Sequence, residues 1–232
     1  MKNTHYDREY FEERDYLNLT IAESIQIFVK DHHLRTILDV GSGTGKLVHF
    51  LNKNGFDAYG CDNADIAIET AQNNNKKNTI IKAPAAKLPF KKNSFDIITA
   101  ISLIEHLTKK EANAFILEAK RVLKPNGFIF IVTPNFASPW RFIQGKKWFG
   151  YSDPTHITFF TPRSLCLLLI NNGFKNIKLW FKTSYNKKYD VMFPRFFSKL
   201  PVPIKRLGIY LLFSTPLSLV RDSFWIAAQK NE

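Results

Sequence analysis

The chain has 232 residues, 45% of them hydrophobic and 14% aromatic, which is enough to bury the core of one large domain and excludes a disordered chain. The two cysteines, Cys61 and Cys166, lie far apart without a CxxC motif, which excludes a disulfide framework and a cysteine zinc site. The formal net charge of +13 indicates an acidic partner, which is either nucleic acid or an anionic membrane or substrate.

The N-terminal part is polar and aromatic up to residue 18, and apolar residues at helical spacing then predict a helix over 20–31. The first residues contain no apolar run of the kind that a signal peptide needs. We therefore expect a reducing, cytoplasmic setting. Residues 1–35 are expected to form a helical cap on a single domain of 232 residues.

Strands and helices then alternate along the chain, because short β-branched runs are separated by segments with helical spacing. The strands are predicted at 36–40, 57–62, 79–83, 94–102, 128–134, 176–181 and 223–229, and the helices at 46–54, 64–75, 109–127 and 161–174. This alternation is typical of βαβ units. The predicted fold class is α/β, with a doubly wound, mostly parallel sheet of seven strands and a core over 36–181.

The segment between the last two predicted strands, residues 182–222, is far longer than a hairpin needs. It holds eight Lys or Arg against two Asp, and residues 207–220 form a run of 14 without charge. That run is too short to span a bilayer. An interfacial membrane element is one interpretation of this basic, apolar insertion, and a lid or dimer contact is the other. Residues 223–232 are expected to add the closing strand, and the basic, aromatic stretch 139–153 to lie at a substrate entrance.

A glycine cluster, GSGTG over 41–45, follows the first predicted strand. Ligands of such sheets bind where the first strand meets its helix, and glycines let a ligand approach the unpaired N–H groups there. A phosphate-binding P-loop is excluded because Val40 and Leu47 replace its first glycine and its hydroxyl residue. The dinucleotide fingerprint GxGxxG is broken by Lys46.

The sequence DVGSGTG (39–45) instead resembles motif I of the class I S-adenosylmethionine-dependent methyltransferases. Further blocks at Cys61-Asp62, 88–107, 117–135 and 153–174 resemble the same family in the same order. The last block is similar to the branch that includes ubiquinone-biosynthesis O-methyltransferases and sugar or lipid methyltransferases. The resemblance implies a Rossmann-like methyltransferase fold with S-adenosylmethionine as the cofactor.

The resemblance also assigns residues to the cofactor. Asp62 matches the acid that accepts both ribose hydroxyls, which suits a carboxylate facing a vicinal diol. Pro84 stands where an acid often binds the adenine amino group, which leaves adenine to the backbone near Ala85 and Ala86 and to packing on Leu88. The remaining cofactor residues implied are Asp39, Gly41, Ser42, Gly43, Gly45, Asn63, Ile101 and Ser102.

Methyl transfer from a sulfonium needs alignment and, for an oxygen nucleophile, removal of a proton. His106 is the first candidate for the general base, with Glu105 to orient it or bind substrate, and His156 beside Asp153 is the second. Each histidine can instead be structural, held by a local partner. Ser102 breaks the Glu-x-x-Glu-His metal motif of the ubiquinone-type enzymes, and one carboxylate with one imidazole is a weak site, so no metal is expected.

The sequence therefore predicts a methyltransferase that acts by in-line transfer, at the oxygen of a small or lipid-linked acceptor such as a sugar, a quinone precursor or a lipid. Peripheral contact with an anionic membrane surface stays open beside the lid or dimer interpretation, as does the oligomeric state. An RNA or protein methyltransferase is one alternative, although the chain lacks an Asn/Asp-Pro-Pro-Tyr motif and an appended RNA-binding module. A non-catalytic cofactor-binding scaffold at membranes is the other, and the intact glycines and Asp62 argue against it.

Overall fold

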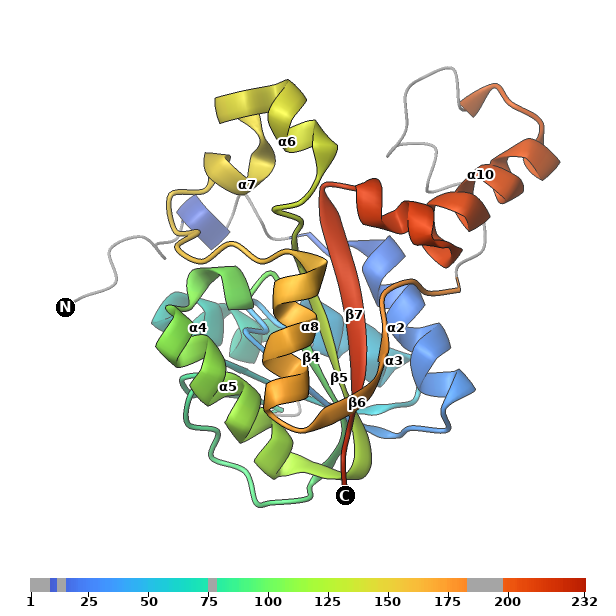
Figure 1. Ribbon diagram of the computed structural model, residues 1–232. Helices are drawn as coiled ribbons and strands as arrows, with labels where there is room; N and C mark the ends of the chain where they lie inside the picture. Colours follow the sequence, from blue (N-terminus) through green and yellow to red (C-terminus); the bar gives the residue numbers. More distant parts are fainter. Residues whose placement is uncertain (1–8, 12–15, 75–78, 183–197) are drawn as a thin grey trace.

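The computed structural model contains one seven-stranded sheet with the strand order β3-β2-β1-β4-β5-β7-β6 (Figure 1). The structure describes residues 9–11, 16–74, 79–182 and 198–232. The strands are β1 (Thr36–Val40), β2 (Asp57–Asp62), β3 (Ile80–Lys82), β4 (Phe95–Ile101), β5 (Leu123–Pro134), β6 (Phe174–Lys178) and β7 (Ser223–Lys230). Strands β1 to β5 are parallel, and β7 pairs antiparallel with both β5 and β6. The predicted doubly wound, mostly parallel sheet is confirmed.

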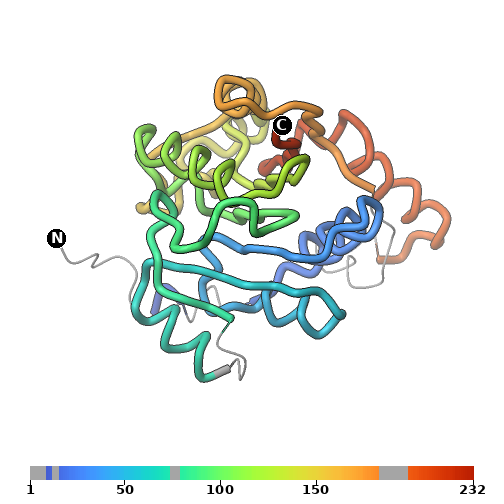
Figure 2. Tube along the Cα trace, turned by 90° about the horizontal axis from the view of Figure 1, so that it is seen from below, coloured from blue at the N-terminus to red at the C-terminus, as the bar shows by residue number. Residues whose placement is uncertain are grey.

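Helices cover both faces of this sheet, as the view along the strands shows (Figure 2). The helices are α2 (Leu19–Asp31), α3 (Lys46–Lys53), α4 (Asp65–Asn74), α5 (Lys109–Val122), α6 (Pro139–Gln144), α7 (Phe149–Ser152), α8 (Pro162–Asn171) and α10 (Val202–Ser214), with 3-10 turns η1 (Ile104–His106), η2 (Gly145–Lys147) and η4 (Pro216–Val220). One core contains Phe115 of α5 and Leu165 of α8, and the other contains Ile25, Leu51 and Ile209 of α2, α3 and α10. Burial on both faces explains why the central strands are continuous apolar runs.

The strand order reverses between β1 and β4, because the chain first moves from β1 to β2 and β3 and then returns to the other side of β1. The loops that follow β1 and β4 therefore diverge to opposite faces of the sheet. In open α/β sheets such a point leaves a crevice at the carboxyl ends of the strands. The glycine cluster and the Glu105-His106 pair follow these two strands, so the fold places both at this crevice.

Two predicted boundaries were wrong. The helix predicted over 109–127 ends at Val122, and Leu123 already pairs with Phe95 in the sheet. The prediction took Pro125 and Gly127 as the stop signal of the helix, but pairing of the buried Leu123 with β4 ends the helix earlier. The strand predicted at 176–181 instead occupies Phe174–Lys178, because Gly173 takes a positive φ of +81° and ends α8 just before the strand begins.

The predicted insertion 182–222 is described from residue 198 onward, and residues 183–197 lie outside the described part of the chain. Helix α10 and turn η4 occupy most of the described segment. They lie at the same end of the sheet as α6 and α7, at the top of Figure 1. Among the described residues, no helix is long and apolar enough to cross a membrane.

Asp96 joins the amino ends of β1, β4 and β5. Its carboxylate accepts the N–H of Thr36 at 2.8 Å, the hydroxyl of Thr36 at 2.7 Å, the N–H of Arg35 at 3.1 Å and the ammonium of Lys124 at 2.8 Å. Burial acts to raise the pKa of Asp96, but the hydrogen bonds from Lys124, Thr36 and Arg35 outweigh it and lower the pKa to about 2.

We expect Asp96→Ala to lower the free energy of unfolding by about 2 kcal/mol, because it leaves charged and backbone donors without their acceptor. Since the folded-state pKa is depressed, the wild-type advantage is present above about pH 4 and declines as the pH falls toward 2. Urea unfolding at several pH values measures it. The control is Asp57→Ala, which removes an exposed ion pair with Arg35 and should cost less than about 1 kcal/mol. Equal losses in both variants would contradict the assignment.

Candidate active site

The loop between β1 and α3 turns sharply because Gly41, Gly43 and Gly45 have φ values of +73°, +51° and +80°. The N–H of Gly41 donates to the carbonyl of Cys61 at 2.8 Å, which attaches the loop to the end of β2. A Cβ at Gly41 would lie 2.9 Å from Cδ1 of Leu103, which follows β4. The loop is therefore held between the ends of β2 and β4, with its backbone exposed to the crevice.

Asp62, at the end of β2, lies beside this loop. Its Oδ2 accepts the N–H of Gly43 and its Oδ1 accepts the N–H of Ala64, both at 2.9 Å. Burial raises the pKa of Asp62, while the N–H groups of Ala64, Gly43 and Asn63 act against the rise. Because each oxygen accepts one of these two hydrogen bonds and has a second lone pair, both oxygens can still accept, which suits two neighbouring hydroxyls of a ribose.

Asp39, the last but one residue of β1, is only 3% exposed and accepts the hydroxyl of Thr99 at 2.7 Å. Burial raises its pKa to about 7, the Thr99 hydrogen bond acts against the rise, and the charge of Asp62 adds to it. A cationic ligand beside Asp39 would favour its ionised form. The hydroxyl oxygen of Ser42 is also buried here and has no hydrogen-bond partner within the described chain, so a polar ligand would satisfy it.

A cavity of about 410 Å³ opens between the glycine loop and the residues after β4. The predicted site residues that line it are Asp39, Gly41, Ser42, Gly43, Ile101, Ser102, Glu105, His106 and His156. Aromatic residues from the N-terminal cap, Tyr10, Phe11 and Tyr16, also line the cavity and were not predicted. These three residues belong to no recognisable motif, so the sequence does not indicate that they lie at the cavity.

Six predicted cofactor residues do not line this cavity: Gly45, Asp62, Asn63, Ala85, Ala86 and Leu88. Gly45 is the N-cap of α3, and a Cβ there would meet the side chain of Ile80. Leu88 belongs to the hydrophobic core, and its N–H donates to Glu118 of α5 at 2.8 Å. The adenine contacts of Ala85, Ala86 and Leu88 stay a prediction.

Ser102, directly after β4, has a positive φ of +49°, which is uncommon for a residue with a side chain. Its N–H donates to the carbonyl of Val132 at 2.9 Å. This bond holds the strained residue against β5 while the chain turns into η1. Backbone strain of this kind is found at functional sites, where the surrounding structure compensates for it.

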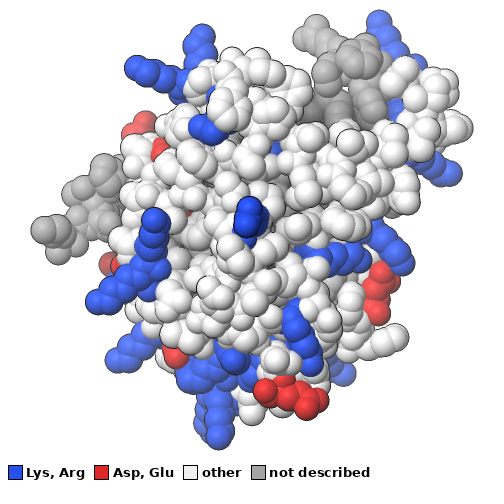
Figure 3. All heavy atoms as spheres, viewed as in Figure 1, with Lys and Arg blue, Asp and Glu red and all other residues white. Residues whose placement is uncertain are grey.

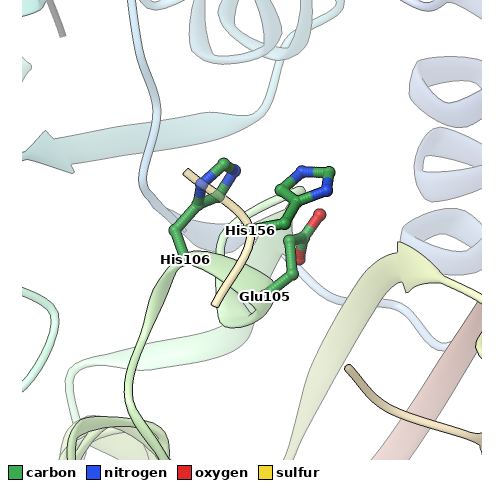
Figure 4. A group of neighbouring side chains, drawn as sticks. All are labelled: Glu105, His106 and His156. Carbon is green, nitrogen blue, oxygen red and sulfur yellow. The ribbon is translucent and has the colours of Figure 1, made fainter. Parts of the chain in front are cut away.

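Two histidines that are 50 residues apart in the sequence meet at this cavity (Figure 4). The ring centroids of His106 and His156 are 4.8 Å apart. Their loops are joined through the backbone, since the N–H groups of Ile157 and Thr158 both donate to the carbonyl of Glu105, at 2.9 and 3.0 Å. The pairing of the two predicted base candidates is therefore a product of the fold.

The hydrogen bonds of His106 determine its tautomer. The hydroxyl of Thr155 donates its one hydrogen to Oδ1 of Asp153 at 2.5 Å, so it can only accept from Nδ1 of His106, 2.8 Å away. Burial acts to raise the pKa of Asp153, but the bonds from Thr155 and the charges of His156 and His106 lower it. Nδ1 of His106 therefore carries the hydrogen, and Nε2 is the basic nitrogen. His156 has the same tautomer, because its Nδ1 donates to the carbonyl of Gly150 at 2.8 Å and a carbonyl can only accept.

Glu105 completes the group. It is buried, and its Oε2 accepts the hydroxyl of Thr133 at 2.9 Å, while its Oε1 has no partner among the described residues. Burial raises the pKa of Glu105 to about 8; hydrogen bonds from its own backbone and Thr133 act against the rise, and the charge of Asp153 adds to it. Glu105 is therefore an acid that can exchange a proton near neutral pH.

The same three side chains could also hold a metal ion. One ligand atom from each of Glu105, His106 and His156 lies within 4.8 Å of the others. The sequence argument against a metal counted only the adjacent pair, and the fold adds the third ligand. Two imidazoles with one carboxylate suit Zn²⁺ better than Mg²⁺ or Ca²⁺. The expectation of no metal stays a prediction.

Comparison with known proteins gives the following similarities. The family described as "Methyltransferase domain" matches residues 38–131. A ubiquinone biosynthesis O-methyltransferase from Pelagibacter ubique is 31% identical over 125 residues, which are 52% of this chain and 51% of the relative. Another from Bartonella bacilliformis is 30% identical over 151 residues, 61% of this chain and 60% of the relative. The chain thus spans about half to six tenths of the length of these relatives.

The fold is also similar to solved structures. The crystal structure of a SAM dependent methyltransferase from Archaeoglobus fulgidus superimposes with a TM-score of 0.62 at 20% identity, covering 97% of this chain and all of the other. At that identity the similarity shows the fold alone. It confirms the Rossmann-like methyltransferase fold that the sequence predicts.

Asp39→Asn is expected to stabilise the unliganded protein at high pH. Since the pKa of Asp39 is raised to about 7 in the folded state, ionisation costs stability as the pH rises from about 4 to about 7. The amide keeps an acceptor for Thr99 and does not ionise. We expect a melting temperature roughly 5 °C above wild type at pH 8 and no gain at pH 4. A gain that is equal at both pH values, or a loss at pH 8, would contradict this account of the buried carboxylate.

Proposed function

We propose that this chain, which belongs to the class I S-adenosylmethionine-dependent methyltransferase superfamily, transfers the methyl group of S-adenosylmethionine to a hydroxyl oxygen of a small or lipid-linked acceptor. One observation supports the proposal above the others: the glycine loop after β1 and the two histidines line the same cavity. When bound, S-adenosylmethionine supplies an electrophilic methyl group on a sulfonium ion. Everything else in the reaction depends on residues of this chain.

The residues around the glycine loop fit this cofactor. The carboxylate of Asp62 has acceptor positions for both ribose hydroxyls. The buried carboxylate of Asp39 lines the cavity, and the positive charge of a sulfonium and an ammonium group would stabilise its ionised form. The buried hydroxyl of Ser42 would gain a partner. These features favour a ligand with a diol at one end and positive charge at the other.

His106 is the proposed general base. Its Nε2 is the nitrogen that carries the lone pair, because Nδ1–H donates to Thr155. Nε2 would take the hydroxyl proton of the acceptor as the oxygen–methyl bond forms, and Asp153 would stabilise the resulting imidazolium through Thr155. Thr155 and Asp153 are thus positioning residues. His156 contributes a second imidazole to the same cavity. Glu105 lines the cavity beside the histidines and would orient the substrate.

The acceptor is proposed to carry an aromatic or lipid group. Aromatic side chains line the cavity from two sides, with Tyr10, Phe11 and Tyr16 on the N-terminal part and Phe149 on α7. Such walls suit a flat ring or an apolar chain and would hold its hydroxyl near His106. The curated relatives are named O-methyltransferases of ubiquinone biosynthesis, which favours a phenolic quinone precursor over a sugar.

We expect Asp62→Asn to weaken S-adenosylmethionine binding about 100-fold. The amide has no charge, and it replaces one of the two oxygens that would accept the ribose hydroxyls with a donor. Calorimetric titration of the purified protein measures it. The matched control is Asp65→Asn, an exposed acid three residues later, which should bind as wild type does. Absence of binding to the wild-type protein would refute the proposed cofactor site.

His106→Gln is expected to lower kcat by 100-fold or more and to leave cofactor binding unchanged, because it removes the base and keeps a polar side chain. Thr155→Val should lower kcat about tenfold, since Nδ1–H loses the nearer of its two acceptors and keeps only the carbonyl of residue 155 at 3.3 Å, and Thr155→Ser should restore it. Release of S-adenosylhomocysteine with phenolic acceptors, with and without a prenyl chain, measures the rate. Nitrogen-15 spectra should show the His106 proton on Nδ1 in wild type and a mixture of tautomers in Thr155→Val. Full activity of His106→Gln would exclude it as the base.

A further inference from the structure

The end of the molecule at the carboxyl ends of the parallel strands exposes large apolar side chains. On α6, Phe142 is 73% exposed and Ile143 71% exposed, with Trp140 beside them. On α10 and η4, many apolar side chains are exposed as well: Val202, Ile204, Leu207, Tyr210, Leu211, Leu217 and Val220. We call this set of α6, α10 and η4 side chains the rim surface. In Figure 1 both helices stand at the top, at the carboxyl ends of the parallel strands.

Helix α10 has apolar side chains on its exposed face as well as on its buried face. Ile209 and Phe213 are buried against the sheet, so this face already attaches α10 to the protein. The opposite stripe contains Ile204, Leu207 and Leu211, at the spacing of one helix face. A helix with water on its outer side carries polar residues there, and this one carries apolar residues.

The α6 and η4 parts of the rim surface are fixed to each other. The indole N–H of Trp148 donates to Oδ1 of Asp222 at 2.8 Å, and the hydroxyl of Ser138 donates to the same oxygen at 3.1 Å. The side-chain amide of Asn135 donates to the carbonyls of Leu219 at 2.6 Å and Arg221 at 3.0 Å. Segments that are 74 to 86 residues apart in the sequence are therefore presented together as one surface.

The charge of the rim surface selects its partner. The segments 136–152 and 198–220 contain no Asp or Glu. They do contain exposed cationic residues next to the apolar ones, at Lys146, Lys147, Lys199 and Arg206. Figure 3 shows white and blue spheres over α6 and α10 in this view. Apolar side chains bordered by cations match the acyl boundary and the phosphates of an anionic lipid leaflet.

We propose that the rim surface docks on an anionic lipid bilayer, with the apolar side chains of α6 and α10 in the interfacial region. The cavity would then open beside the lipid, since Phe149 and Ser152 of α7 line its mouth. An acceptor with an apolar chain could keep the chain in the bilayer while its hydroxyl reaches His106. This inference names the setting of the proposed acceptor. Vesicle binding requires neither cofactor nor acceptor, so it can be tested apart from methyl transfer.

The test is co-sedimentation of the full chain with phosphatidylcholine vesicles that contain or lack phosphatidylglycerol. We expect binding to the anionic vesicles, weakened by added salt, and at least tenfold weaker binding to the neutral ones. The double variant Phe142→Glu with Leu207→Glu should lose at least tenfold in binding, because both side chains would place a carboxylate at the lipid phosphates. The matched control is Leu117→Glu on α5, which is 51% exposed and lies outside the rim surface, and it should bind as wild type does.

Three outcomes would overturn the proposal. The first is equal binding of anionic vesicles by wild type and the double variant. The second is that light scattering finds the wild type as a dimer and the double variant as a monomer, while neither protein binds vesicles. The third is binding of RNA without binding of anionic vesicles. Cofactor titration of the double variant shows whether its fold is intact, so loss of vesicle binding can be assigned to the surface.

Discussion

The cofactor half of the proposed site is built around two carboxylates, Asp39 and Asp62, that burial withdraws from water. Asp39 is buried at the end of β1. The hydroxyl of Thr99 donates to it, and the charge of Asp62 acts to raise its pKa. Within the described residues, neither carboxylate forms an ion pair with Lys or Arg. The cost of this arrangement falls on the empty protein, and a cationic ligand recovers it. The proposed preference for a positively charged ligand would thus follow from desolvation.

The histidine half of the site depends on a different constraint, the attachment of the 153–158 loop to η1. The carbonyl of Glu105 accepts two N–H groups from that loop, which brings Thr155 to His106 and His156 to the same rim. The Asp153–Thr155–His106 chain then decides which imidazole nitrogen is basic. Because the loop follows β5 and η1 follows β4, the two histidines meet only when these strands pair in register.

The rim surface and the cavity share the region of α6 and α7. Trp148 anchors the α6–α7 region to Asp222 at the start of β7, and α7 contributes Phe149 and Ser152 to the cavity mouth. A contact made by α6 with a lipid leaflet would therefore act on residues that border the site. The half-buried Arg221, whose guanidinium carbon lies 4.1 Å from the ring centroid of Phe213, joins η4 to α10.

The fold class, and the places of the glycine loop, Asp62 and the Glu105-His106 pair at the ends of strands, could be predicted from the sequence. These features depend on contiguous patterns, since strand–loop–helix units place motif residues at the ends of parallel strands wherever they occur. The tertiary structure alone decided that Leu123 begins a strand, that Tyr10 and Phe11 line the cavity, and that Thr155 orients His106. It also decided that α6 and η4 form one surface through Asp222. The physical reason is that each of these depends on a contact between distant segments, and no local spacing or propensity records such a contact.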